Sequence, residues 1–384
     1  MNRLWLVLLV IVAIVVGTLL WRGAGPQETP TLALVDYTSE GGPDGVAIVD
    51  LNPGSRTFGE ILQRVAIAPG ANPHHLYYNR DGSRLYTTAL GDHALYRITL
   101  RDERIEEIVP LDTGSCVGGE DLYFSEDGKK FYLTCLGSSQ VIVFDAKSER
   151  MLSSIEAPPP NEPYFLHPHG IDADEGIDRL IITNTISLKL DNPQSALTII
   201  ELSSGKVLST HLLAKDPSVP SGPVEVTFLP DRSLAFVTNM LEGTLWMAIW
   251  NEQSKEFKFK LVDDGGPRGQ SWPLEIYPGP DGNLYVSWAQ PGLVNVYNLK
   301  DPEAPRLIRT LPAEPGAHHI AFSNDGRYLF VQNNLLNLEK MNAGTISVLD
   351  LNSGRPVATV DSFIQQGLQP ASLLLLGRGG GRGY

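Results

Sequence analysis

The chain contains little cysteine, methionine or positive charge. Its 384 residues include 2 Cys and 5 Met, and 30 Lys and Arg stand against 44 Asp and Glu, which gives a formal net charge of −14. An acidic protein of this kind repels phosphate groups, so we expect no nucleic-acid partner and no attraction to anionic membrane surfaces. Hydrophobic residues still make up 42% of the chain, which excludes a disordered or fibrous protein.

The motifs of several common enzyme classes are also missing. The sequence has no Gly-x-Ser-x-Gly nucleophile elbow, no Walker motif and no dinucleotide-binding glycine motif in the required strand and helix context. Catalytic-triad hydrolysis, nucleotide binding and NAD chemistry are therefore disfavoured.

A long uncharged apolar run occurs at the N-terminus. Residues 4–21 form an 18-residue stretch, close to the roughly 20 residues that cross a bilayer as a helix. Because the run ends in Trp21 and Arg22 follows it, an uncleaved signal-anchor (residues 1–24) is favoured over a cleaved signal peptide, and residues 25–31 form a linker. Arg3 precedes the run, so the positive-inside rule places the rest of the chain on the periplasmic or extracellular side.

The remainder of the chain is built from repeats. The 37 Gly and 28 Pro are spread along the sequence, which indicates many turns between short strands. Six segments recur about every 45 to 55 residues, each with two apolar runs around an Asp-Gly type turn and two further strand-like runs. They begin at Asn72, Gly118, Leu166, Gly222, Trp272 and Ala317. Each repeat therefore predicts one four-stranded sheet.

Sheets repeating at this period predict an all-β fold, a β-propeller that hides its sheet edges by radial closure. Residues 32–67 look like three strands without an inner strand, and residues 369–376 look like an inner strand alone. Together they predict a seventh blade that both ends of the chain close. The propeller would span residues 32–376, and residues 377–384 would form a flexible Gly/Arg tail.

Ionisable residues recur at one level of the repeats. One position lies seven residues before the turn glycine in the repeats that have such a glycine. It is occupied by His75, Asp121, His169, Glu225, Glu275 and His319. Because His, Asp and Glu make up 52 of 384 residues, chance predicts about one such residue at six positions. The preceding position adds His74, Glu120 and His318, whereas the seventh blade contributes Ser372.

Equivalent positions on inner strands converge on the propeller axis, so these residues predict a metal site at the channel mouth. Imidazole and carboxylate groups suit copper, zinc, iron or manganese. We expect His75, His169, His319, Glu225, Glu275 and Asp121 as ligands, and His74, His318, Glu120 and His167 as alternates or orienting groups. The competing interpretation is that these polar groups hydrogen-bond neighbouring blades.

Three further features belong near this mouth. Loops longer than the repeat requires, residues 185–195 and 335–343, follow second strands and would face the ion, and Trp272 would wall a substrate pocket. Cys116 and Cys135 lie near the same end of adjoining strands. A disulfide, two free thiols and a thiol at the channel mouth all remain open.

The runs 234–239 (LAFVTN) and 344–351 (GTISVLDL) resemble YVTN-type propellers. The paired His at the first inner strand and the long loop after residues 331–334 are similar to the selenium-binding protein and methanethiol oxidase family. This resemblance implies a copper-dependent oxidase that converts methanethiol to formaldehyde, hydrogen sulfide and hydrogen peroxide. A small neutral substrate also agrees with the lack of an arginine clamp beside the His residues.

Two alternatives stay open. The runs 167–170 (HPHG) and 316–319 (GAHH) resemble the inner strands of lactonases related to 6-phosphogluconolactonase, which implies a metal-dependent hydrolase. That family places arginines beside the His residues, but Ala317, Val224 and Leu274 stand at the matching positions here. The other alternative is a non-catalytic scaffold whose channel face binds a protein.

Overall fold

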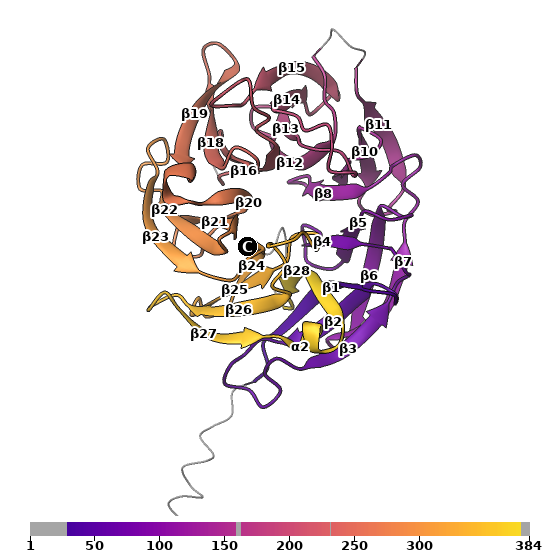
Figure 1. Cartoon of the computed structure of the whole chain (residues 1–384). Coiled ribbons are helices and arrows are strands. Elements are labelled where there is room, and N and C mark those ends of the chain that lie inside the picture. The colour runs from indigo at the N-terminus through magenta and orange to yellow at the C-terminus, as the bar shows by residue number, and fades with distance from the viewer. Residues whose placement is uncertain (1–28, 159–162, 231, 378–384) are drawn as a thin grey trace, which may run out of the picture.

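The computed structural model describes residues 29–158, 163–230 and 232–377, which form a ring of seven four-stranded sheets (Figure 1). This confirms the predicted all-β, seven-bladed propeller. The predicted anchor (residues 1–24), residues 25–28 of the linker and residues 378–384 of the tail lie outside the described residues. Within the described part of the chain, no helix has the length and apolar character needed to cross a membrane.

Six blades are continuous in sequence, and in each the first strand lies nearest the axis. Their bounds are β4 (Pro73–Tyr78), β5 (Leu85–Ala89), β6 (Leu95–Arg101) and β7 (Arg104–Pro110); β8 (Gly119–Phe124), β9 (Lys130–Cys135), β10 (Gln140–Asp145) and β11 (Met151–Glu156); β12 (Pro168–Asp174), β13 (Arg179–Asn184), β14 (Ala196–Glu201) and β15 (Lys206–Leu212). The other three are β16 (Pro223–Phe228), β17 (Leu234–Asn239), β18 (Thr244–Asn251) and β19 (Glu256–Asp264); β20 (Ser271–Pro278), β21 (Asn283–Gln290), β22 (Leu293–Asn298) and β23 (Arg306–Pro312); β24 (Ala317–Phe322), β25 (Tyr328–Asn333), β26 (Thr345–Asp350) and β27 (Arg355–Val360). A 3-10 turn, η1 (Gly266–Arg268), precedes β20, and one helical turn, α2 (Ser362–Gln365), follows β27.

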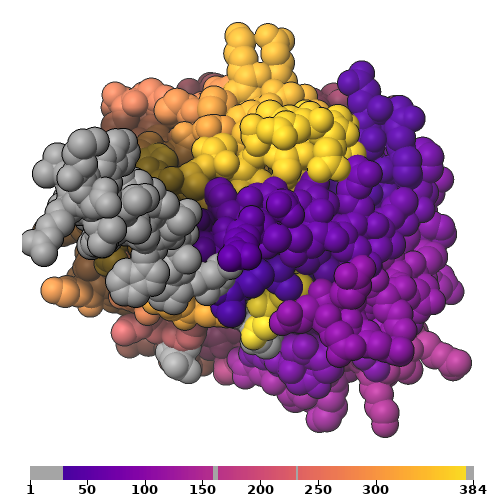
Figure 2. Space-filling view, turned by 90° about the horizontal axis from the view of Figure 1, so that it is seen from below, coloured from indigo at the N-terminus to yellow at the C-terminus, as the bar shows by residue number. Residues whose placement is uncertain are grey.

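The seventh blade combines both ends of the described chain. Its strands are β28 (Leu368–Leu375), β1 (Leu32–Ser39), β2 (Gly45–Asp50) and β3 (Ile61–Ala66), in that order. The pairing of β28 with β1 runs from Ala33↔Leu375 to Ser39↔Leu368. Figure 2 shows the indigo and yellow segments adjoining on the face seen from below. The predicted split blade therefore closes the ring.

Each of the six continuous inner strands carries a β-bulge near its start. In β4 the pairing passes from Pro73↔Ala89 to Leu76↔Thr87, so one strand advances three residues while its partner advances two. The same shift occurs in β8, β12, β16, β20 and β24. Successive side chains of a regular strand face opposite sides, whereas a bulge re-aims them. Two adjacent residues of each inner strand can therefore face the channel.

A hydroxyl group on the second strand holds each bulge in three consecutive blades. Thr134 accepts a hydrogen bond from the Asp121 amide (2.9 Å) and donates to the His169 carbonyl of the next blade (2.6 Å). Thr183 and Thr238 form the same links to the carbonyls of Val224 (2.7 Å) and Leu274 (2.6 Å). These threonines stand 13 residues after the amide they bind. This clasp joins neighbouring blades and satisfies backbone groups that the bulge leaves unpaired.

In the split blade an acidic residue, Asp36, takes the position of the threonine. Its Oδ2 accepts hydrogen bonds from Ser372 of β28 (2.7 Å) and from Thr87 of the next blade (2.8 Å). The side chain is fully buried, and this burial raises the pKa of Asp36 from 3.8 to about 7, although the two hydroxyls lower it in part. The closure of the ring therefore contains a carboxyl group that is protonated below neutral pH.

We expect Asp36→Asn to change how stability depends on pH. The folded protein holds the proton of Asp36 more tightly than the unfolded chain does, so protonation of Asp36 stabilises the fold. This stabilisation is fully present below about pH 4 and is lost as the pH rises to about 7. Relative to the Asn variant, the wild type should lose about 4 kcal/mol between pH 4 and pH 8. Urea unfolding of both proteins at several pH values measures this difference, and parallel curves would contradict the assignment.

The two cysteines form a disulfide. Cys116, before β8, and Cys135, at the end of β9, are bonded with their Cα atoms 5.3 Å apart and 19 residues apart in sequence. A loop of this length stabilises a fold by about 3 kcal/mol through the entropy it removes from the unfolded chain. Of the three alternatives left open by the sequence, the structure has the disulfide.

Candidate metal centre and its cavity

Seven buried side chains from five inner strands meet around the axis at one end of the channel. We call them the His–Glu cluster, and they are His74, His75, Glu120, His169, Glu275, His318 and His319. The bulges explain the adjacent pairs, because His74 and His75 of β4 both face the channel, as do His318 and His319 of β24. Their ring centroids lie 4.3 Å and 4.0 Å apart within the two pairs.

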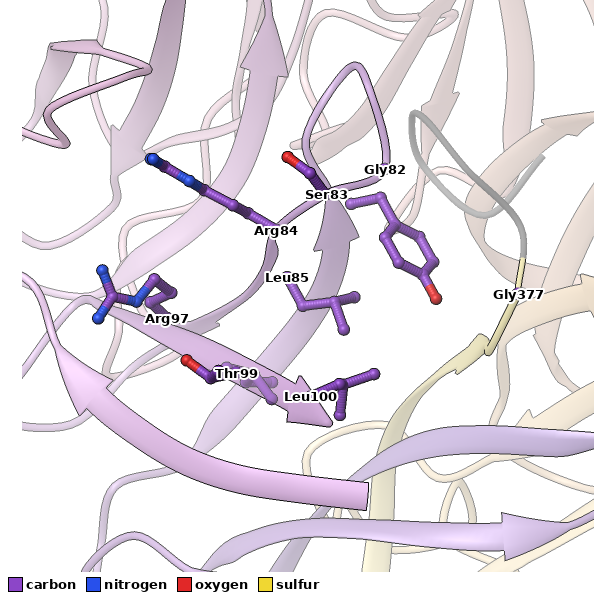
Figure 3. A pocket seen from close by; sticks show the side chains of 10 residues that line it. Gly82, Ser83, Arg84, Leu85, Arg97, Thr99, Leu100 and Gly377 are labelled. Carbon is purple, nitrogen blue, oxygen red and sulfur yellow. The ribbon is translucent and has the colours of Figure 1, made fainter. Parts of the chain in front are cut away.

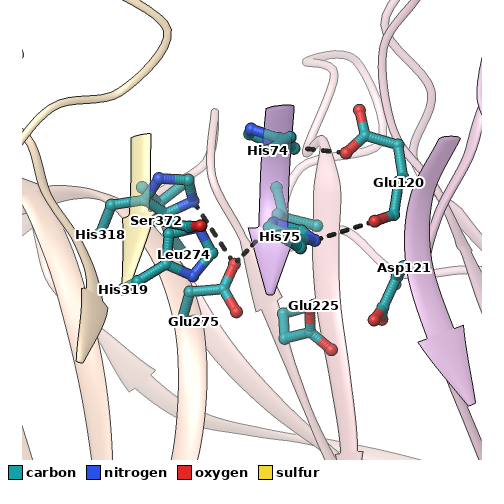
Figure 4. Close-up of polar contacts among 12 residues, drawn as sticks. His74, His75, Glu120, Asp121, Glu225, Leu274, Glu275, His318, His319 and Ser372 are labelled. Atoms are coloured by element: carbon teal, nitrogen blue, oxygen red, sulfur yellow. Dashed lines mark hydrogen bonds and ion pairs between the residues drawn. The ribbon is translucent and has the colours of Figure 1, made fainter. Parts of the chain in front are cut away.

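Two carboxylates organise the cluster (Figure 4). Glu120 Oε2 lies 3.2 Å from His74 Nε2 and 3.4 Å from His169 Nε2. Glu275 Oε1 lies 3.4 Å from His318 Nε2 and 3.8 Å from His75 Nε2. The donor atoms form two overlapping groups, each with all its atoms within 4.8 Å of one another. One group is His74, His75, Glu120 and His169, and the other is His75, Glu275, His318 and His319.

His75 belongs to both groups, and its orientation is set by its neighbours. Its Nδ1 donates to the Glu120 carbonyl oxygen (3.0 Å), and the Tyr77 hydroxyl lies 3.1 Å from the same nitrogen. Nε2 is therefore the nitrogen with the available lone pair, and among the described residues it makes no hydrogen bond although it is buried. Metal-binding His residues commonly donate their second nitrogen to a backbone carbonyl in this way.

Electrostatics favours a cation in the cluster. Burial, together with the neighbouring His residues, lowers the pKa of His74 and of His75 well below the usual 6.5, so both imidazoles are neutral and can ligate. Burial raises the pKa of the Glu120 carboxyl well above its usual range, and the negative charges of Asp121 and Glu275 raise it further. A bound cation would stabilise the ionised form of Glu120. The donor set therefore fits a borderline transition metal.

Some predicted ligands lie outside both groups. Asp121 accepts hydrogen bonds from the Tyr77 hydroxyl of the preceding blade (2.5 Å) and from the Ile171 amide of the following blade (2.9 Å). Glu225 accepts from the Val226 amide of its own strand (2.9 Å). His167 contacts Asn192 of the loop 185–195 through Nε2 (3.2 Å). Asp121 thus hydrogen-bonds both neighbouring blades, which is the competing interpretation that the sequence left open for these polar residues.

The structure also shifts the register of His169 by one residue. The amide that binds the clasp hydroxyl in this blade belongs to Gly170, so His169 is equivalent to His74 and not to His75. In this hairpin the residue with left-handed backbone conformation is Asp178 (φ 58°). Its strands also stay paired for one residue more than those of the β4–β5 hairpin, ending at Asp174↔Arg179. Gly176 is thus not the turn glycine, and aligning the repeats on it misplaces the strand.

Four members of the His–Glu cluster form the polar floor of a cavity of about 370 Å³. Its floor residues are His74, Glu120, His169 and His318, with Val224 and Leu274 at the equivalent positions of β16 and β20. Trp272 and the loops 185–195 and 335–343 supply walls of this cavity, as predicted from the sequence. The leucines of these loops also line the wall, although no pattern in the sequence marked them as site residues.

A second cavity lies at the opposite end of β4 and is a weaker candidate (Figure 3). It measures about 480 Å³, and its cationic residues are Arg84 and Arg97. Both guanidinium groups pair with Glu149, at 3.1 Å and 2.7 Å. Because both guanidinium groups already bind Glu149, and Arg84 also donates to the Ala146 and Lys147 carbonyls, this cavity does not present a built anion site.

Comparison with known proteins supports the fold. No protein-family model matches the chain, and no curated protein matches it in sequence. Among solved structures, a hypothetical selenium-binding protein from Sulfolobus tokodaii superimposes with a TM-score of 0.74 at 17% identity, over 92% of this chain and 95% of that one. A 6-phosphogluconolactonase-like protein from Bacteroides fragilis gives a TM-score of 0.58 at 15% identity, over 92% and 99%.

A third similar structure is the virginiamycin B lyase of Staphylococcus aureus, with a TM-score of 0.53, 17% identity, and coverage of 74% of this chain and 82% of that one. At these identities the likeness shows a shared seven-bladed propeller. The two resemblances stated from the sequence are thus confirmed at the level of the fold.

Proposed function

We propose that this protein is a metal-dependent oxidoreductase whose His–Glu cluster binds one transition-metal ion, with copper preferred over zinc, iron or manganese. One observation carries the proposal: five imidazoles and two carboxylates form a buried cluster, and four of these side chains, those of His74, Glu120, His169 and His318, form the floor of an apolar cavity. A bound copper ion would supply one-electron and O₂ chemistry, which protein side chains do not provide. The protein groups hold the ion, exclude bulk water and position the substrate.

The substrate is proposed to be a small neutral thiol such as methanethiol. Among the described residues that line the cavity there is no Lys or Arg, whereas Glu120 and Glu339 are acidic. An anionic substrate would therefore meet repulsion without a compensating cation. The likeness of fold to a protein described as selenium-binding agrees with a site for soft ligands.

The proposed location is the periplasmic or extracellular side of a membrane, with residues 1–24 as the anchor. The Cys116–Cys135 disulfide supports this placement, because disulfides persist in oxidising compartments. Recovery of the full-length protein from the soluble cytoplasmic fraction would contradict it.

We expect the copper-loaded protein to oxidise methanethiol in air. One methanethiol, one O₂ and one water would give one formaldehyde, one hydrogen sulfide and one hydrogen peroxide, so O₂ uptake should equal peroxide release. His75→Ala should lower both signals because it removes one of the four donors from each group, whereas His93→Ala, at an exposed position, should leave them unchanged.

A lactonase is the second candidate, favoured by the likeness of fold to 6-phosphogluconolactonase-like proteins. The absence of cations among the described cavity residues restricts it to neutral lactones. Metal-dependent acid release from neutral lactones, without O₂ uptake, would support the hydrolase over the oxidase. Inactivity of the metal-loaded protein in both assays would favour a protein-binding scaffold.

A further inference from the structure

We propose that the cavity takes a neutral molecule with one polar head and an apolar body of about ten non-hydrogen atoms, so that methanethiol is only the smallest member of the substrate class. This inference rests on the proposed function for the position of the head group. The size, shape and charge of the cavity carry the rest.

The volume of the cavity far exceeds that of methanethiol. The cavity measures about 370 Å³, and a water molecule occupies about 30 Å³ of liquid, so there is room for about a dozen non-hydrogen atoms. Methanethiol has two. A two-atom substrate would leave most of the apolar wall in contact with water, which forgoes the main source of affinity in such a pocket.

The floor is divided into a polar and an apolar part. Each bulge places two adjacent residues toward the channel, and the first of the two lies at the cavity floor. In four strands this first residue is polar (His74, Glu120, His169 or His318), whereas in β16 and β20 it is Val224 and Leu274. Val224 and Leu274 join a buried apolar cluster with Met240, Leu335 and Met341. A ligand that fills this floor needs a polar group over one side and hydrocarbon over the other.

The two loops that wall the cavity are held in place by their own hydrogen bonds. In the second loop the Leu335 amide donates to the Met341 carbonyl (2.8 Å) and the Met341 amide donates to the Leu338 carbonyl (3.0 Å). In the first loop the Gln194 amide donates to the Thr185 carbonyl (2.6 Å). The apolar wall is therefore formed before a ligand binds, which lowers the entropic cost of binding.

These loops also keep leucines partly in water. Leu190 is 46% exposed and Leu336 is 41% exposed, and both line the cavity. The ring does not need these two side chains for its core, since neither belongs to a hydrophobic core cluster of the described residues. We therefore assign the exposed surface of these two leucines to contact with a ligand in the cavity.

The test is a binding series with n-alkan-1-ols of two to ten carbons, measured by calorimetry on protein kept metal-free with a chelator. Each added methylene is worth about 0.8 kcal/mol, so the Kd should fall about fourfold per carbon and about 250-fold from butanol to octanol. The Kd should stop falling once the chain fills the cavity. Octanoate should bind at least about 100-fold more weakly than octanol, because its charge would be buried without a cation.

Two double variants complete the test. Leu190→Ser with Leu336→Ser should weaken octanol binding about tenfold, by removing apolar contact worth about 1.4 kcal/mol. Leu62→Ser with Leu212→Ser is the matched control, since those leucines are also exposed but lie on β3 and β15. A Kd independent of chain length, tight octanoate binding or equal effects of the two variants would overturn the inference. Because the measurements use metal-free protein, failure of the proposed oxidase leaves their outcome unaffected.

Discussion

Deletion of residues 369–376 is expected to leave a chain that does not fold. The deletion removes all but the first residue of the inner strand β28, together with the residue that follows it, and four of the lost side chains are buried leucines: Leu373, Leu374, Leu375 and Leu376. Burial of four leucine side chains stabilises a fold by roughly 6 to 12 kcal/mol, which is comparable to the whole stability of an ordinary domain. The deletion also leaves β1 without its hydrogen-bonded partner beside the axis.

Circular dichroism and thermal melting of the truncated protein test this expectation. The matched control removes residues 378–384 only, which keeps the full length of β28. A truncated protein that melts like the control would show that the ring does not depend on closure by its two ends.

Triple replacement of His75, His169 and His319 by alanine is expected to reduce the amount of transition metal that the protein binds to less than about a tenth of the wild-type content. The substitutions remove two of the four donors from each group, so neither retains the three or four protein ligands typical of transition-metal sites. Elemental analysis of untagged protein, purified without chelator, measures the loss. The exposed His93 provides a control substitution.

Two single variants locate the ion between the overlapping groups. Glu120→Gln affects only the group with His74 and His169, whereas Glu275→Gln affects only the group with His318 and His319. The larger loss of metal therefore identifies the occupied group. Equal metal content in the wild type and the triple His variant would exclude the cluster as the metal site.

The fold was predictable because repeats, turns and radial closure act at the level of whole strands. Segments with two apolar runs around an Asp-Gly turn define the hairpins, and the incomplete segments at the two ends define the split blade. Small errors of register do not change such a pattern. The anchor depends on residues that the structure does not describe, so it stays a prediction.

The site was predictable only in part because it depends on single residues. The turn glycine aligned four inner strands well enough, but the hairpin containing Gly176 places its left-handed residue at Asp178. The bulges also bring His74 and His318 to the channel beside His75 and His319, which a regular alternating strand would not do. Composition and periodicity alone do not show a bulge.

One signal in the sequence does mark the bulge. A Thr of the second strand stands 13 residues after the second channel residue in four blades, as in Asp121 and Thr134, and Ser287 stands 12 residues after Glu275. Aligning repeats on this hydroxyl places His169 with His74 directly. The apolar wall had no comparable signal, because leucines such as Leu190 and Leu336 lie in irregular loops.

The clasp formed by the second-strand hydroxyl groups has a consequence for the evolution of such propellers. It joins blades through backbone amides and carbonyls, so the first side chain of each bulge can be exchanged without altering how the ring is held together. Within this one chain that position already carries His, Glu, Val and Leu. A lineage could therefore acquire or discard ligands one codon at a time while inheriting an intact scaffold. Propellers of such a lineage would share their architecture at low identity and differ in chemistry.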